Sequence, residues 1–441
     1  MKICGTIAVD VGTSSCKLGV VTTDGDVFFT RRRFFPVLSG EYLTASLLFS
    51  VVLEELNSTI DCCVENKVLI LGICISGNGP TIVSVDRTNR EKDVLLMWNE
   101  KIDDARQGVP FAYKDLDCIE NSLSIFLPRL LAFKTKYAPS YQNAQYLLPL
   151  VEYLTFRLTG CACTLLPEER FAPYYWQRCE LDACGVNHSL LPPFVELGFC
   201  AGYYRGVKVF VGPPDYVAAL IGSATLFEGT ACDVAGSSEG INITVRTVPS
   251  SLPNNLRVMP SPVPNLWTVA SLFSDVGTRF ARRVEELARN YMFRSSDIED
   301  NFLEVMEVIS TCYFKNFRTT GASSIASNDS SYCINACVPS CFFDIYDEVI
   351  NILSSLKAGF DLLEKTTGFK GTYVLSGGHA KNEAYTKMKA HFTGRSFSLL
   401  RHSDAELLGD AAIVFYRCRI FSSLQEAATV GANNATRQTE D

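Results

Sequence analysis

The sequence predicts an α/β protein made of two domains that share one local pattern. The chain has 441 residues, and at roughly 100–200 residues per domain this length suggests two to four domains, or two large ones. Apolar strand patterns are mixed with helical patterns along the chain, which is typical of an α/β fold. The segment Asp-Val-Gly-Thr-Ser-Ser from residue 10 returns as Asp-Val-Ala-Gly-Ser-Ser from residue 233, which indicates an internal duplication of half-chains.

The amino-acid composition indicates a folded protein and argues against nucleic-acid and membrane partners. Apolar residues make up 47% of the chain and charged residues 20%, which is enough to build sizeable cores. The 40 Lys and Arg residues against 48 Asp and Glu residues give a net charge of −8. Nucleic acids and anionic membranes require clustered Lys and Arg, and the one dense basic run is residues 31–33, so we expect neither partner. The longest apolar stretches fall short of the ~20 residues that a bilayer span requires.

Cysteine usage indicates a reducing compartment. The 17 cysteines are scattered and odd in number, and the chain is long enough to build its cores without disulfides. We therefore expect reduced thiols and a cytoplasmic location. The amino terminus is apolar but meets Asp10 and a glycine turn, so it is predicted to be a buried strand and not a signal peptide.

The first domain is predicted to begin with a hairpin meander. Residues 6–10 form an apolar strand, a turn of Gly, Thr and Ser follows, and residues 16–22 return as a second strand. Apolar spacing predicts a helix at 43–56, and a continuous apolar run predicts a strand covered on both faces at 67–76. The further elements are strands at 82–86 and 94–98 and a helical stretch at 123–160 with Gly160 as its C-cap.

A domain boundary is expected after Pro213, which gives domains of residues 1–213 and 214–441. The second domain begins with a helix at 215–222, whose first turn carries Asp215, and continues with the second hairpin at 231–245. The remaining predicted elements are helices at 277–290, 344–366, 383–392 and 404–417, a strand at 371–375, a glycine loop at 376–382 and a flexible loop at 319–331.

Three turns rich in glycine and hydroxyl residues are candidates for binding phosphate groups. Glycine lets the backbone approach an anion and point N–H groups at it, and hydroxyl groups add donors. No G-x-x-x-x-G-K-[ST] motif is present, so these turns are not a Walker loop. Together they predict two phosphate cradles that face each other across a cleft. The residues concerned are Gly12, Thr13 and Ser14 in the first turn, Gly236 and Ser237 in the second, and Gly377 and Gly378 in the third.

The order of motifs adds a family resemblance. The matched segments are 10–17 for D-[IL]-G-T-S-S-x-K, 76–78 for S-G-Q, 156–160 for y-R-L-T-G, 212–222 for G-x-x-D-x-x-a-A-x-x-G, 235–238 for A-G-T-S, 377–382 for G-G-x-[AS]-x-[NS] and 406–412 for E-x-x-x-x-G-A-A. With them the chain resembles the FGGY carbohydrate kinases of the actin/hexokinase/Hsp70 superfold from Thr6 to about Phe415. The resemblance implies two actin-like (ribonuclease H-like) α/β domains with an interdomain cleft. The first would bind the sugar and one phosphate, and the second would bind the nucleotide.

The resemblance also implies roles for matched residues. Asp215 would be the general base that takes the proton from the attacking hydroxyl group, kept ionised by the dipole of its helix. The alternative, that Asp215 only caps this helix, stays open. Asp10 would hold Mg²⁺, usually through water, and its alternative is a strand-end acid that pairs with a turn. The transferring phosphate would be bound by Gly12, Thr13 and Ser14, and the β-phosphate by Gly236 and Ser237. The nucleoside would be bound by Gly377, Gly378 and Asn382.

The expected sugar positions depart from the family pattern. The S-G-Q segment ends in Asn78 instead of Gln, and W-x-D-x-R is present as Trp98-Asn99-Glu100-Lys101-Ile102, with Glu for Asp and without the Arg. We take Asn78, Trp98, Glu100 and Asp215 as the substrate residues. Trp98 could stack on a sugar ring, and core packing would explain it equally well. The nucleotide positions are thus retained while the sugar positions drift.

The resemblance predicts an enzyme that uses ATP and Mg²⁺ to phosphorylate a hydroxyl group of a small-molecule sugar or polyol. A pentulose such as xylulose is the first choice, and a homodimer is left open. The alternative is a catalytically weak or silent sensor of a sugar or nucleotide that has the same fold. An actin-like or Hsp70-like ATPase that acts on proteins is a third interpretation, against which the order of the sugar motifs argues.

Overall fold

The computed structural model of this chain describes residues 3–36, 42–102, 122–236, 238–289, 291, 293, 298–320, 338–433 and 437–438. The chain divides into two units. The first unit contains Met1–Leu226, Pro260–Asn265 and Ala405–Asn434, and the second unit contains Phe227–Met259, Leu266–Asp404 and Ala435–Asp441. These units differ from a division after residue 213, because the two helices predicted at 215–222 and 404–417, which this division gives to the second domain, lie in the first unit.

Close packing explains where these two helices lie. Helix α8 (Asp215–Gly222) contacts helix α13 (Ala405–Arg417), and α13 also contacts strands of the first unit. A Cβ atom at Gly222 would lie 1.8 Å from the carbonyl oxygen of Ala405, so glycine is required for the two backbones to come this close. The chain therefore returns from the second unit to pack α13 on α8.

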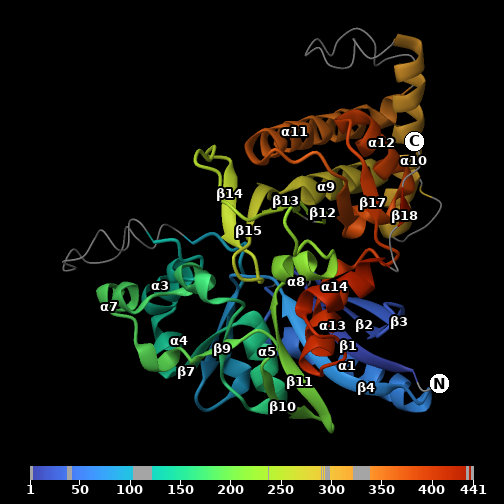
Figure 1. Ribbon diagram of the computed structural model, residues 1–441. Helices are drawn as coiled ribbons and strands as arrows, with labels where there is room; N and C mark the ends of the chain where they lie inside the picture. The colour runs from blue at the N-terminus through green and yellow to red at the C-terminus, as the bar shows by residue number, and fades with distance from the viewer. Residues whose placement is uncertain are drawn as a thin grey trace. The chain divides into compact units, whose positions relative to one another are not determined.

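A six-stranded mixed sheet forms the base of the first unit (Figure 1). Its order is β10-β11-β4-β1-β2-β3. Strands β1, β2 and β3 form an antiparallel meander, β1 pairs in parallel with β4, and β4 pairs in parallel with β11. The predicted meander and the predicted strand at 67–76 are confirmed. The strands are β1 (Cys4–Val11), β2 (Ser15–Thr22), β3 (Val27–Phe34), β4 (Leu69–Gly77), β10 (Cys200–Tyr204) and β11 (Val207–Pro214).

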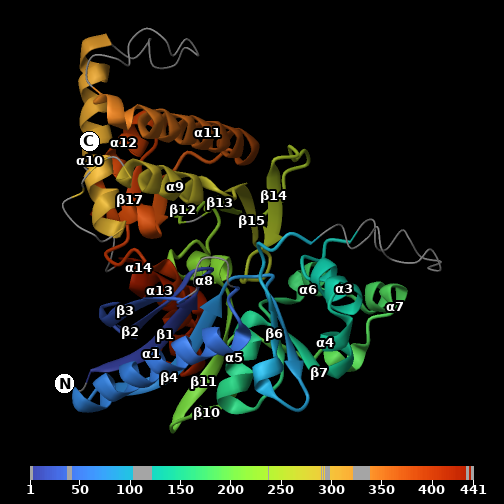
Figure 2. The same ribbon diagram turned by 180° about the vertical axis from the view of Figure 1, so that it is seen from behind.

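Helices cover both faces of this sheet, as Figures 1 and 2 show from opposite sides. Helices α1 (Ala45–Glu65) and α5 (Leu150–Thr159) pack with Ile73 and Ile75 of β4 in one apolar cluster. The residues between and after these two isoleucines, at 74 and 76, point to the opposite face and bond to α13. Both faces of β4 are therefore buried, as its continuous apolar run predicts.

Two small sheets and four short helices complete the first unit. The elements are η1 (Arg90–Lys92), the sheet β6 (Val94–Leu96), β5 (Ile82–Asp86) and β7 (Ala144–Pro149), the pair β8 (Thr164–Leu166) and β9 (Phe194–Glu196), and the helices α3 (Leu127–Thr135), α4 (Ala138–Asn143), α6 (Ala172–Tyr175) and α7 (Arg178–Cys184). The helical prediction for 123–160 is wrong at β7, because pairing with β5 makes this segment a strand. Gly160 ends α5 with φ of 77°, so the predicted C-cap is confirmed.

The second unit repeats the topology of the first. Its sheet has the order β14-β15-β13-β12-β16-β17-β18, in which β12, β13 and β15 form an antiparallel meander and β12 pairs in parallel with β16, which pairs in parallel with β17. The five strands β15-β13-β12-β16-β17 correspond in order and direction to β3-β2-β1-β4-β11 of the first unit. The predicted duplication is therefore present in the fold. The strands are β12 (Ala231–Ala235), β13 (Glu239–Val245), β14 (Leu256–Pro260), β15 (Trp267–Phe273), β16 (Tyr373–Ser376), β17 (Phe397–Leu399) and β18 (Arg437–Gln438).

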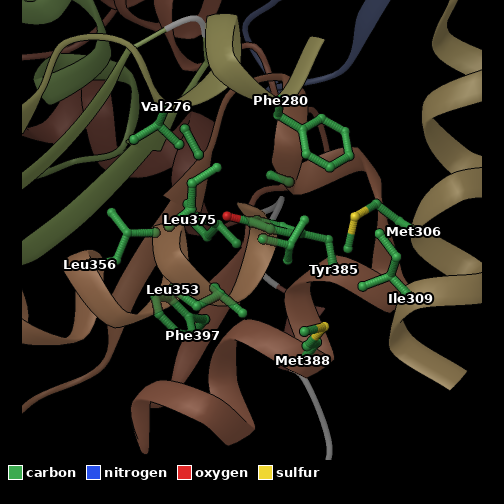
Figure 3. Packing of buried hydrophobic residues seen from close by; sticks show 14 of the residues in the cluster. Val276, Phe280, Met306, Ile309, Leu353, Leu356, Leu375, Tyr385, Met388 and Phe397 are labelled. Carbon is green, nitrogen blue, oxygen red and sulfur yellow. The ribbon is translucent and has the colours of Figure 1, made fainter. Parts of the chain in front are cut away.

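Helices and strands of the second unit share one apolar core (Figure 3). Phe280 of α9, Met306 of α10, Leu353 of α11 and Met388 of α12 point into it together with Leu375 of β16. The predicted helices at 277–290, 344–366 and 383–392 are confirmed, whereas α10 and α14 (Leu424–Asn433, in the first unit) were not predicted. The helices of this core are α9 (Val276–Ala288), α10 (Ile298–Thr320), α11 (Phe343–Thr367) and α12 (Glu383–Thr393). Most of the loop expected at 319–331 lies outside the described residues.

The described residues bear on the expected absence of membrane spans and of disulfide bonds. None of the described helices combines the length and the apolar composition that crossing a membrane requires. No disulfide bond joins the cysteines that the structure describes.

Candidate active site

The first glycine turn joins β1 to β2 in the first unit. The N–H of Gly12 donates to the carbonyl oxygen of Ser15 at 2.9 Å, and the carbonyl oxygen of Ser14 accepts from the N–H of Phe35 at 2.9 Å. Gly12 and Thr13 are half-buried, and Ser14 is exposed. The turn is thus anchored at both ends while its hydroxyl groups stay accessible, and its binding of phosphate stays a prediction.

The indole of Trp98 is hydrogen-bonded to this turn. Trp98 donates through Nε1 to Thr13 Oγ1 at 2.8 Å, and its backbone N–H donates to Thr81 Oγ1 at 3.0 Å. The Thr81 hydroxyl donates to Asn78 Oδ1 at 2.5 Å, and Asn78 Nδ2 donates to the carbonyl oxygen of Val11 at 3.2 Å. The structure therefore brings three predicted site residues, Thr13, Asn78 and Trp98, into one hydrogen-bond network at the end of β1.

Glu100 turns back onto its own loop. Its Oε1 accepts from the N–H of Met97 at 3.1 Å. Arg129 of α3 is only 8% exposed, donates to the carbonyl oxygens of Met97 (3.1 Å) and Trp98, and lies in the field of Glu100. Sequence reasoning missed Arg129, and its signal was a single charged residue inside the apolar segment 127–133. Glu100 and Arg129 shape the loop that carries Trp98.

Asp10 ends β1 as a buried acid that is 6% exposed. It lies opposite Lys17 in the strand register, and Lys17 Nζ is 3.7 Å from Asp10 Oδ2. Within the described residues, no group of three or more His, Cys, Asp or Glu side chains could hold a metal ion. A single carboxylate is what a protein typically contributes to a Mg²⁺ ion that keeps its waters and binds nucleotide phosphates, so Asp10 fits this ion.

Asp215 is the first residue of α8, and it is half-buried. Its Oδ1 accepts the N–H of Tyr216 at 2.7 Å. Burial of the carboxyl group and the negative charge of Glu406 raise its pKa to about 7, while the Tyr216 N–H and Lys17 oppose the rise. Lys17 thus acts on both Asp10 and Asp215, so the predicted metal residue and the predicted base share one electrostatic environment. A carboxyl group with this pKa exchanges protons near neutral pH.

The open alternative for Asp215 was a purely structural cap. The N-cap position of α8 is occupied by Pro214, and no side chain makes the capping hydrogen bond there. Asp215 is therefore placed one residue inside the helix, where its carboxyl group lies at the positive end of the helix dipole and accepts one N–H of the first turn, that of Tyr216.

A buried carboxyl group of α13 lies beneath the same strands. Asp410 accepts from the Ser76 hydroxyl at 2.9 Å and from the Cys74 thiol at 3.6 Å, and it is fully buried. Burial raises the pKa of Asp410 well above its usual range, and the negative charge of Asp10 adds to the rise. Burial therefore favours the protonated form of Asp410. Sequence reasoning did not single it out, although it separates Gly409 from the two alanines of the last motif.

A small pocket of the first unit is lined by Pro214, the residue before Asp215. Its wall includes Asn78 at the end of β4, Pro214 at the end of β11, and Glu152 and Tyr175. Glu152 Oε1 accepts the N–H of Leu165 at 2.8 Å, and burial raises the pKa of Glu152 to about 7. Among the described residues that line it, the pocket has one carboxyl group and no basic side chain. This lining suits an uncharged hydroxylated ligand better than an anion.

The second glycine turn joins β12 to β13 in the second unit. The N–H of Gly236 donates to the carbonyl oxygen of Ser238 at 2.9 Å, which closes the turn. Ser237, predicted to face the β-phosphate, lies outside the described residues. Beneath the turn, Lys389 of α12 forms buried ion pairs with both strands of the hairpin.

The third turn lies directly beside the second one. Gly377 follows β16 with φ of 89°, and a Cβ atom there would lie 2.3 Å from the carbonyl oxygen of Ala235, so no other residue fits. Gly378 is exposed with open space around its Cα. Asn382 is buried and caps α12, because its Oδ1 accepts the N–H of Tyr385 at 2.9 Å. Gly236, Gly377 and Gly378 are thus gathered, whereas Asn382 is largely committed to its helix.

His379 lies in the same loop and packs among aromatic rings. It stacks on Phe302 with ring centroids 5.4 Å apart. Burial and then the charge of Lys389 lower its pKa to about 4, so the imidazole is uncharged at neutral pH.

Comparisons with known proteins bear on the fold. No protein-family model matches the chain, and no curated protein matches its sequence. A ligand-bound xylulose kinase from Lactobacillus acidophilus matches 99% of this chain and 93% of its own, with a TM-score of 0.72 and 15% identity. A gluconate kinase from the same organism matches 100% of this chain and 93% of its own, with a TM-score of 0.72 and 15% identity. A Plasmodium falciparum glycerol kinase with ADP matches 98% of this chain and 93% of its own, with a TM-score of 0.72 and 14% identity.

The chain has the fold of the FGGY carbohydrate kinases. The predicted fold class, two actin-like α/β domains, is thereby confirmed. The three kinases named differ in acceptor, so this kinase fold by itself leaves the acceptor open.

Proposed function

We propose that this chain is an ATP-dependent kinase that transfers a phosphoryl group to a hydroxyl group of a sugar or polyol, with a pentulose such as xylulose as first candidate. The observation that carries the proposal is Asp215, a carboxyl group at the start of α8 with a pKa of about 7, beside Lys17 and one residue after Pro214, which lines a pocket. The xylulose, gluconate and glycerol kinases of the same fold support the reaction class, and the ADP in the glycerol kinase structure supports ATP as donor.

Asp215 would act as the general base. The acceptor hydroxyl gives its proton to Asp215 while its oxygen bonds to the γ-phosphorus, and the bond from that phosphorus to the β,γ-bridging oxygen breaks to release ADP. The base must be ionised, so we expect activity to fall as the pH drops below 7. Asp10 would hold Mg²⁺ through water, and this ion, when bound, offsets charge on the phosphates.

The glycine turns would bind the nucleotide. Gly12, Thr13 and Ser14 would donate hydrogen bonds to the transferring phosphate, where charge changes during the reaction. The remaining contacts would come from Gly236 and Ser237 to the β-phosphate and from Gly377, Gly378 and Asn382 to the nucleoside.

The pocket lined by Pro214 favours an uncharged acceptor. Glu152, Asn78 and Tyr175 are the lining residues whose side chains carry polar groups. These groups bind hydroxyl groups, whereas a sugar acid would meet a second carboxyl group without a basic partner. Xylulose or glycerol therefore fits this wall better than gluconate.

A sensor without turnover is the second candidate. Asn78 Oδ1 is occupied by Thr81, and Glu100 Oε1 is occupied by the N–H of Met97, so two of the predicted sugar residues already have partners within the protein. Such a protein would bind a sugar or nucleotide and release little ADP.

ADP release measured against a panel of ketoses, polyols and sugar acids tests the proposal. We expect one uncharged sugar or polyol to stimulate release, and Asp215→Asn to lower the stimulated rate by at least about 100-fold, since general bases typically contribute 10²–10⁴. Asp182→Asn, an exposed acid of α7 paired with His188, is the matched control and should keep full activity. Nucleotide binding without sugar-dependent turnover would favour the sensor, and hydrolysis raised only by proteins would favour the ATPase. The cytoplasmic location and a homodimer stay predictions.

A further inference from the structure

A lysine without access to solvent lies beneath the second glycine turn. The side chain of Lys389, on α12, is 0% exposed and forms ion pairs with Asp233 and with Glu239, whose Oε1 is 2.5 Å from Lys389 Nζ. Both carboxylates are equally inaccessible. We call these three residues the buried triad. The motif comparison did not include Lys389 or Glu239.

The two acids of the buried triad stand on opposite arms of the hairpin. Asp233 lies in β12, two residues before its end, and Glu239 is the first residue of β13. Ala235 and Glu239 are partners in the strand register, directly at the turn that contains Gly236. One cation therefore joins both arms at the point where the chain reverses.

The buried triad is costly for folding. Taking charges out of water costs several kcal/mol per ion, and apolar residues in place of a buried ion triad are often neutral or stabilising. Its surroundings are largely aromatic, with Lys389 Nζ 5.4 Å from the ring centre of Phe397 and 6.0 Å from that of Tyr385. Asp233 Oδ1 and Glu239 Oε2 have no hydrogen-bond partner among the described residues. Stability alone does not account for charges at this place.

Charge beneath the turn matters for an anion bound above it. Buried charges act strongly on their neighbours because the surrounding dielectric constant is low. Without the lysine, Asp233 and Glu239 would present up to two negative charges to the back of the turn. The two acids hold the pKa of Lys389 above its usual value in spite of burial, so the ammonium stays charged.

We propose that Lys389 is a positioning residue for nucleotide binding: it cancels the negative charge of Asp233 and Glu239 and ties both arms of the second turn together, so that this turn can accept a phosphate group. This inference rests on the proposed function only in taking the second turn as a phosphate site. The acceptor pocket lies in the first unit, whereas the buried triad lies in the second.

The test is the dissociation constant of ADP, measured by titration calorimetry, with KM values for ATP and acceptor beside it. Lys389→Met should raise the Kd of ADP and the KM of ATP at least tenfold and leave the acceptor KM within twofold. Lys389→Arg should recover part of the affinity. Adding Asp233→Asn and Glu239→Gln to Lys389→Met should recover most of it, because no negative charge is then left behind the turn. Lys387→Met, an exposed lysine of the same helix, is the control.

A folded Lys389→Met variant, judged by circular dichroism and thermal unfolding, that binds ADP like the wild type would overturn the inference. Should Lys389→Met not fold, Glu239→Gln decides, since it keeps Lys389 paired with Asp233 and removes one negative charge. The expected result is an ADP Kd at least twofold lower, and an unchanged or higher Kd overturns the inference. Wild-type protein that does not bind ADP would overturn the proposed function together with this inference, whereas sugar-dependent turnover with an unaltered Kd in the variant overturns the inference alone.

Discussion

One N–H group determines how the first glycine turn presents its hydroxyl groups. The sequence left open whether Trp98 stacks on a sugar or packs in a core, and in the structure its Nε1 donates to Thr13 Oγ1 at 2.8 Å. A hydroxyl oxygen that accepts one hydrogen bond still has its own hydrogen to donate. The indole therefore orients the Thr13 hydroxyl, and through it a donor for a phosphate oxygen.

Trp98→Phe keeps an aromatic ring and removes this donor. A hydrogen bond between neutral groups contributes about 1 kcal/mol, so we expect the free energy of unfolding to fall by about that amount. We expect kcat for sugar-dependent ADP release to fall by about fivefold, because about 1 kcal/mol of lost transition-state stabilisation has that effect. Trp176→Phe, a buried indole of the first unit that packs on Phe126 and Phe194, is the control. A raised acceptor KM with unchanged kcat would instead support stacking of Trp98 on the sugar.

The sequence did not reveal the charged residues that are buried inside the units. Asp10 and Asp215 could be named as candidate site residues, because each lies where a strand ends and a turn or helix begins. Lys389 and Asp410 each interrupt the apolar face of a helix, and their partners lie 156 and 334 residues away along the chain. A sequence pattern shows the interruption but not the partner, so the residues that neutralise or support the site became visible only in the fold.

At the scale of elements, a crossing of two helices sets the position of Asp215. Helix α8 carries Asp215 at its start, and α13 carries Glu406 and Asp410. The crossing is close at a second point as well, where a Cβ atom at Gly409 would lie 2.0 Å from the carbonyl oxygen of Ala218. The charge of Glu406 can raise the pKa of Asp215 because the two helices approach this closely.

Gly409→Ala should force α8 and α13 apart. Overpacking a core typically costs about 1–3 kcal/mol, and the contact here is with backbone, which cannot rotate away as a side chain can. We expect a loss of at least about 2 kcal/mol in urea unfolding and a loss of activity, because Asp215 moves with α8. Gly431→Ala in α14 is the matched control, since its Cβ would meet Leu408 at an ordinary 3.7 Å. Equal stability of the two variants would contradict the close crossing.

Local patterns were sufficient for some elements and insufficient for others. The meander of β1 to β3 and the helices α8, α11 and α13 follow from apolar periodicity and from the turn residues between them. Strand β7 was missed because a short apolar run has no intrinsic preference strong enough to decide, and its pairing with β5 joins residues about 60 positions apart. The repeat of the hairpin motif predicted the duplication, but the return of α13 to the first unit depends on backbone contacts between distant glycines.

At the scale of the whole molecule, the two units differ in how they bind protons. In the first unit burial raises the pKa of Glu152 and Asp215 to about 7 and that of Asp410 well above its usual range. In the second unit burial lowers the pKa of His379 to about 4, while Asp233 is held in the ion pair with Lys389. The three buried acids of the first unit therefore bind protons more tightly in the folded chain, whereas His379 binds its proton less tightly.

The sign of the pH dependence follows from proton linkage. An acid with a raised pKa binds its proton more tightly in the folded state, so its contribution to stability is complete below the pKa of the unfolded chain and is lost as the pH rises through the folded pKa. A histidine with a lowered pKa has the opposite effect between about pH 4 and 6.5. Rising pH should therefore destabilise the first unit and stabilise the second unit up to about pH 6.5.

Calorimetric unfolding between pH 5 and 7.5 tests this difference. If the units unfold separately, we expect the Tm of the first unit to fall by at least about 5 °C, since 1 kcal/mol changes Tm by about 2–4 °C for units of this size. The Tm of the second unit should rise up to about pH 6.5 and then level off, because His379 takes up a proton in this range only when the unit is unfolded. Asp410→Asn identifies the first unit's transition: an amide cannot take up the proton, so the Tm of this variant should fall less steeply with pH and exceed the wild-type Tm at pH 7.5. A first-unit Tm that rises with pH would show that these carboxyl groups are ionised in the folded chain, and Asp410 would then need a cation close to it.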